Sequence, residues 1–83
     1  MKRWASAFHR VLKLSHDAEV MMNRLHSRDV AGDGYHRLIL ARARTSAYGA
    51  CWGPRNFPRL LQAERELKEA VARSEVFDAA LWS

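Results

Sequence analysis

Four histidines in this sequence have a side chain that could bind a metal ion. On a helix, two metal-ligating histidines need a spacing of three or four residues, because only then do they lie one turn apart on the same face. His9, His16, His26 and His36 include no such pair. We therefore expect four solvated surface histidines, and the sequence predicts no metal site.

Catalysis has two further candidates, a cysteine and an acidic loop. Cys51 lies between Ala50 and Trp52 in an apolar setting, whereas a catalytic thiol needs a nearby base and an electropositive environment. Residues 29–34 contain two Asp and two Gly, but Leu40 stands where a calcium loop needs its bidentate Glu. No glycine pattern typical of a phosphate-binding loop occurs. The sequence thus predicts a protein that is not an enzyme and needs no cofactor.

Arginine is the residue type that points to molecular recognition. Residues 34–63 contain five arginines and no acid, with aromatic side chains among them. The guanidinium group is planar and weakly hydrated, which suits phosphate and carboxylate groups. We predict a partner-binding or phosphate-binding surface formed by Arg37, Arg42, Arg44, Trp52, Arg55, Phe57 and Arg59. The excess of eleven arginines over three lysines is also what a GC-rich genome produces without selection for binding, so both explanations stay open.

Charge is distributed unevenly along the chain, whose formal net charge is +5. Residues 1–16 hold four bases and no acid, whereas residues 17–33 hold four acids and two bases. Residues 64–83 have a slight excess of acids. The electropositive parts of the sequence are therefore its N-terminal segment and its arginine-rich middle.

Composition favours helices over strands. The chain has five Val, one Ile and one Thr, and its four Gly and two Pro are too few for the turns of an all-β fold. A length of 83 residues suits one domain with a single core, so we expect one helical domain over residues 1–83. A lone cysteine excludes an intrachain disulfide, as is typical of a reducing cytoplasm, which is the compartment we expect.

Three segments have the apolar periodicity of helices, and they should position the arginines. They cover residues 2–28, 35–51 and 58–81, and the segments between them contain the turn-forming Gly and Pro. Ser15 interrupts the apolar pattern of the first segment and is also a good N-cap, so a break near Ser15 stays open. The second segment is apolar on most sides, which predicts neighbours on more than one face. The expected fold is all-α, a small antiparallel bundle of three main helices.

Two classes of function fit these features. The first is a non-enzymatic interaction protein, an adaptor or inhibitor that docks on a larger protein or nucleoprotein assembly, because Trp, Tyr and Arg anchor interfaces. Phages and other mobile elements encode short single-domain chains of this kind to block host machinery, anti-CRISPR proteins included. The alternative is a small basic DNA- or RNA-binding regulator or accessory factor. A homodimer stays open.

Membrane contact is a weaker hypothesis. The basic, amphipathic N-terminal segment could lie on an anionic lipid surface, but the same residues suit a bundle helix with a basic outer face. No stretch approaches the roughly 18 apolar residues of a membrane span. His9, Arg10 and Lys13 interrupt the apolar run that an export signal would need. The sequence therefore predicts no membrane partner.

Overall fold

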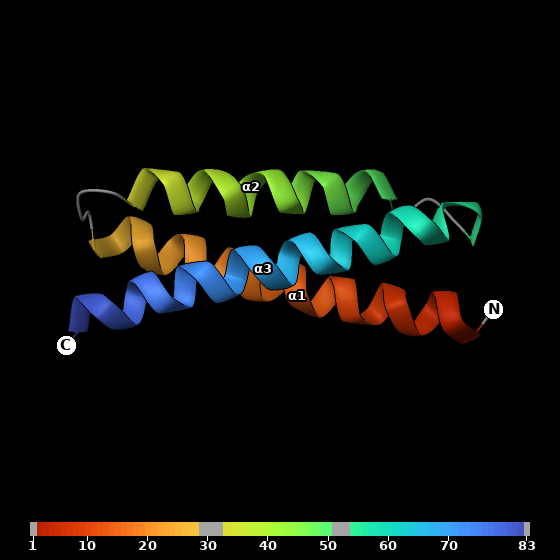
Figure 1. Cartoon of the computed structure of the whole chain (residues 1–83), viewed down its shortest axis with the longest axis horizontal. Helices are drawn as coiled ribbons and strands as arrows, with labels where there is room; N and C mark the ends of the chain where they lie inside the picture. The colour runs from red at the N-terminus through yellow and green to blue at the C-terminus, as the bar shows by residue number, and fades with distance from the viewer. Residues whose placement is uncertain (1, 29–32, 51–53, 83) are drawn as a thin grey trace.

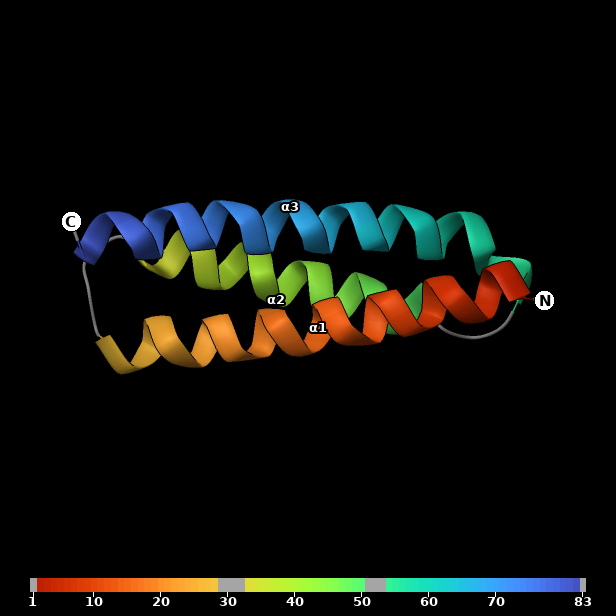
Figure 2. The same cartoon turned by 90° about the horizontal axis from the view of Figure 1, so that it is seen from below.

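A computed structural model describes residues 2–28, 33–50 and 54–82 of the chain. The described residues form three α-helices, α1 (Lys2–Arg28), α2 (Asp33–Ala50) and α3 (Phe57–Trp82), and one short 3₁₀ helix, η1 (Pro54–Asn56), before α3. α1 and α3 run in the same direction and α2 runs antiparallel to both (Figures 1 and 2). No strand occurs in the described ranges. The prediction of an all-α bundle of three main helices is confirmed.

α1 is a single helix that continues through Ser15. The Ser15 side chain is buried, and its hydroxyl accepts a hydrogen bond of 3.3 Å from Nε of Arg44 in α2. Ser15 therefore does not begin a second helix, and the polar group that interrupts the apolar pattern has its partner on a neighbouring helix. α3 carries Pro58 in its first turn, where the ring's fixed φ and missing N–H cost nothing.

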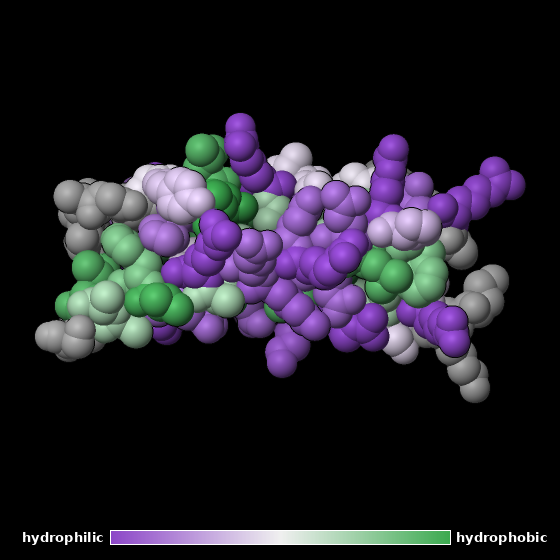
Figure 3. Space-filling model, in the orientation of Figure 1, coloured by the Kyte–Doolittle hydropathy of each residue, from purple (hydrophilic) through white to green (hydrophobic). Residues whose placement is uncertain are grey.

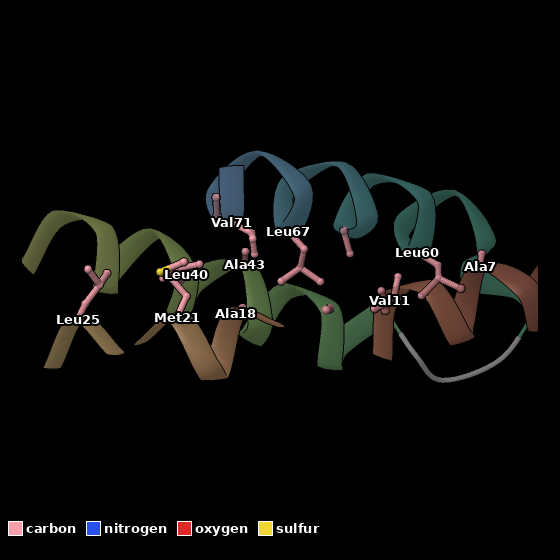
Figure 4. Packing of buried hydrophobic residues seen from close by; sticks show 14 residues of the cluster. Ala7, Val11, Ala18, Met21, Leu25, Leu40, Ala43, Leu60, Leu67 and Val71 are labelled. Atoms are coloured by element: carbon pink, nitrogen blue, oxygen red, sulfur yellow. The ribbon is translucent and has the colours of Figure 1, made fainter. Parts of the chain in front are cut away.

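The core is a narrow line of small side chains along the bundle axis (Figure 4). Half of the buried apolar residues that the structure describes are alanine, which lets the helices approach closely. α2 shows this most clearly, because its buried apolar residues are Leu40 and three alanines. The molecule is correspondingly slender, at 44 × 19 × 16 Å. Each large buried side chain therefore supplies a large share of the apolar burial.

Aromatic pairs lie toward both ends of this core. Near the start of α1, the rings of Trp4 and Phe8 stack with centroids 5.1 Å apart. Toward the opposite end, the His36 ring of α2 stacks on Phe77 of α3 at 4.4 Å. His36 is half-buried, so the expectation that all four histidines are solvated is wrong for this one, whereas the other three are exposed.

Two ion pairs between α1 and α3 fix how these parallel helices align. Arg10 donates two hydrogen bonds to the buried Glu64 carboxylate, from Nε to Oε2 at 2.7 Å and from Nη2 to Oε1 at 3.2 Å. Arg24 Nη1 lies 3.4 Å from Oδ2 of the buried Asp78. The partners are 54 residues apart in both pairs, as parallel helices in constant alignment require. The hydrogen bonds from Arg10 lower the pKa of Glu64, although burial opposes them.

Ser74 is a polar residue inside the core. It is 0% exposed, and its hydroxyl has no hydrogen-bond partner among the described residues. A buried hydroxyl without a partner costs about 1–3 kcal/mol, and alanine is the better helix former. We expect Ser74→Ala to raise the free energy of unfolding by about 1 kcal/mol in urea denaturation. Ser27→Ala, at an exposed site of α1, is the matched control and should change it by less than about 0.5 kcal/mol. A loss of stability in Ser74→Ala would contradict this prediction.

Candidate functional site

One side of α2 faces solvent without carrying charge. α2 contacts α1 and α3 with its other two sides, as its apolar pattern predicted, and Leu40 points into the core. Five residues on this side follow a spacing of three and four, the exposed Gly34, Leu38, Thr45 and Tyr48 and the half-buried Ala41, and we call them the α2 stripe. Leu38 is 52% and Tyr48 56% exposed. The stripe is therefore an exposed, uncharged surface about four turns long.

Arg44 connects the α2 stripe to α1. Its Nη2 donates a 2.8 Å hydrogen bond to the Tyr48 hydroxyl and lies 3.5 Å from Oε2 of Glu19. Nε of Arg44 bonds to Ser15, and the guanidinium carbon lies 5.7 Å from the centroid of the Tyr48 ring. Arg44 therefore holds two helices together and fixes the position of Tyr48. Arg37 lies seven residues earlier, on the same edge of α2, and is half-buried.

Arg42 lies on the other edge of α2, in a groove between α2 and α3. The groove measures about 340 Å³, and its lining includes Arg42 and Arg73 as well as Glu66 and Glu69. Arg73 is already bonded to Glu69, at 2.8 Å. Figure 3 shows mostly hydrophilic side chains across the middle of the face that carries α3. Two guanidinium groups and two carboxylates balance each other here, so the groove has no net charge.

Arg55, Phe57 and Arg59 lie together at the end of the bundle where η1 leads into α3. The start of α1 lies at the same end (Figure 1). Arg3, Ser6 and Arg10 of α1 line a hollow of about 320 Å³ there together with Phe57, which is half-buried against the core. Arg3, Arg55 and Arg59 are exposed and form no ion pair within the described part of the chain.

This end carries the whole net charge of the protein. Arg10 of α1 binds Glu64 of α3, and Ser46 of α2 lines the same groove as Glu66 of α3. Residues 2–13, 46–50 and 54–66 therefore lie in the same half of the bundle. These ranges contain seven basic and two acidic residues, a formal charge of +5. Residues 14–45 and 67–83 contain seven of each. We call the first group of ranges the electropositive end.

The predicted arginine surface is therefore divided in the structure. Arg55, Phe57 and Arg59 share the electropositive end, whereas Arg37, Arg42 and Arg44 lie along α2 and do not join them. Trp52 and Cys51 fall outside the described residues. Sequence reasoning did not include Arg3 and Arg10 in the site. Their signal was the acid-free N-terminal segment, which an up-down-up bundle brings next to the start of α3.

Within residues 2–28, 33–50 and 54–82, no group of three or more His, Cys, Asp or Glu side chains could hold a metal ion. None of the described helices is long and apolar enough to cross a membrane. No protein-family model, curated protein or solved structure matches the chain. Function is therefore inferred from the residues and their geometry.

Proposed function

We propose that this chain is a non-enzymatic interaction protein, an adaptor or inhibitor, that docks on a larger protein through the α2 stripe. The observation that supports the proposal is the exposure of Leu38 and Tyr48 on a helix side without charge. The solvent side of a helix in a small bundle is ordinarily polar or charged. The centre of a protein interface is instead depleted of charge and enriched in aromatic residues such as tyrosine.

The geometry of the stripe suits a helix of the partner. Leu38 and Tyr48 are ten residues apart, about 15 Å along α2, and the smaller Ala41 and Thr45 lie between them. Large anchors at both ends and small residues in the middle leave room for close approach of a second helix. Arg44 already holds the Tyr48 side chain in place, so docking costs little additional side-chain entropy at this residue.

Charge along the edge of the stripe favours a partner with acidic residues over a second copy of this chain. Arg37 and Arg44 follow one edge of the stripe, and α2 has no acid beyond its first residue, Asp33. Two copies docked stripe to stripe would bring arginine edges near each other, which is unfavourable. A helix with an apolar face and an acidic rim is complementary to this surface.

Affinity capture from a lysate of the native host, quantified by mass spectrometry, tests the proposal. Leu38→Ser should lower recovery of the partner about tenfold or more, because truncating an interface anchor costs at least that much. Val76→Ser is the matched control, since Val76 is 72% exposed on α3, away from the stripe. Both variants should keep the wild-type melting temperature, because neither side chain is in the core.

Two outcomes would contradict the proposal. Equal recovery of every captured protein by the wild type, Leu38→Ser and Val76→Ser would show that the stripe does not dock a partner. A wild-type dimer in light scattering that Leu38→Ser converts to a monomer would show that a second copy of the chain covers the stripe.

A further inference from the structure

The electropositive end is a second surface, distinct in chemistry from the α2 stripe. We propose that this end binds the phosphate backbone of nucleic acid without reading its base sequence. The inference goes beyond the proposed protein docking and does not depend on it, because the arginines that carry it, Arg3, Arg55 and Arg59, are not part of the α2 stripe.

The first support is that the charge of this end is largely unpaired. Of its two acids, Glu64 already binds Arg10 and also lies 3.5 Å from Nζ of Lys68. Arg3, Arg55 and Arg59 stay exposed without an ion pair in the described ranges. Three free guanidinium groups at one end of the bundle can displace the counterions of a polyanion, which is what drives non-specific nucleic-acid binding.

The second support is the kind of groups that line the hollow at this end. Arg3, Arg10 and Ser6 offer guanidinium and hydroxyl donors on its wall, next to Phe57. Interfaces with nucleic acid are polar and strongly basic, whereas protein interfaces have an apolar centre. The donors and the charge therefore favour phosphate oxygens over an acidic protein surface.

The shape of this end explains why base reading is not expected. α1 and α3 both begin here, and neither has an acid in its first turn to offset the partial positive charge of a helix N-terminus. The bundle therefore meets the nucleic acid end-on, so no long side of a helix enters a groove to contact base edges. A cross-section of 19 × 16 Å spans about five phosphates of one strand at about 3.4 Å of rise each.

Fluorescence anisotropy with a labelled duplex DNA of arbitrary sequence, over about 50–200 mM NaCl, tests the inference. If Arg3, Arg55 and Arg59 neutralise about three phosphates, the logarithm of the association constant should fall against the logarithm of salt with a slope of about −3. A duplex of different sequence and equal length should bind equally. The double variant Arg55→Gln/Arg59→Gln should reduce the slope by about two, since each phosphate contact contributes about one.

Arg42→Gln is the matched control. Arg42 is exposed, as Arg55 and Arg59 are, but it lies in the charge-balanced groove, so its removal should leave the salt slope unchanged. Leu38→Ser should bind DNA as the wild type does, which keeps this inference separable from the proposed protein docking. Melting temperatures of all variants confirm that each one is folded.

Three results would overturn the inference. They are no binding at the lowest salt, an equal loss of slope in Arg42→Gln and in the double variant, and binding to polyglutamate with no binding to DNA. The last result would identify an acidic protein as the ligand of the electropositive end.

Discussion

Leu40→Ala should lower the free energy of unfolding by about 3 kcal/mol, in the usual range of about 2–5 kcal/mol for a buried leucine. Leu40 is fully buried, and the other buried apolar residues of α2 are alanines. Neighbouring side chains on α2 are therefore too short to fill the cavity. An 83-residue domain has about 4–12 kcal/mol of stability, so this single change removes a large part of it.

Urea denaturation followed by far-UV circular dichroism measures the effect of Leu40→Ala. Leu61→Ala is the matched control, because Leu61 is a leucine on α3 whose side chain is partly exposed. We expect it to cost less than about 1 kcal/mol. A loss below about 1 kcal/mol in Leu40→Ala would mean that α2 is not held by its inward-facing residues, and the packing described above would be wrong.

His16→Pro should destabilise the protein by about 3 kcal/mol or more, because it places proline inside a continuous helix. The ring clashes with the carbonyl of Leu12, and the helix loses the hydrogen bond of the amide of residue 16. His16 is exposed, so the loss of its side chain contributes little. The effect therefore reports on the backbone of α1.

The same substitution distinguishes the two arrangements that the sequence left open at Ser15. If a second helix began after Ser15, residue 16 would occupy its first position, where proline is well tolerated. A His16→Pro variant as stable as the His16→Ala control would therefore contradict the continuous α1. Thermal unfolding of the two variants beside the wild type gives the comparison.

The helices could be predicted because local patterns determine them. Apolar periodicity and the positions of Gly and Pro gave ends within two residues of those described for α1, α2 and α3. Continuity at Ser15 could not be predicted, because its partner Arg44 is 29 residues away in the sequence. For a similar reason, the sequence did not show which apolar side of α2 faces the core. Leu38 and Leu40 are equally apolar, and packing against α1 and α3 decides between them.

The acids of α3 show a different limit of prediction from the sequence. The four-residue spacing of Glu64 and Lys68 predicts an ion pair on the solvent side of the helix, but Glu64 is buried and Arg10 is its main partner. Arg10 and Arg24 have the same 14-residue separation as Glu64 and Asp78, a signal that the sequence did contain. This equal separation predicts two ion pairs only once α1 and α3 are known to be parallel. The electropositive end could be identified only with the same knowledge, because it combines the start of α1, the end of α2 and the start of α3.

The up-down-up order of the helices also decides how the protein can be handled in an experiment. α1 begins at the electropositive end and α3 ends at the far end, on a molecule 44 Å long (Figure 2). A purification tag or dye attached before Lys2 would therefore cover the surface proposed to bind DNA. One attached after Trp82 would point away from it, and immobilisation through that end would leave the surface open to ligand.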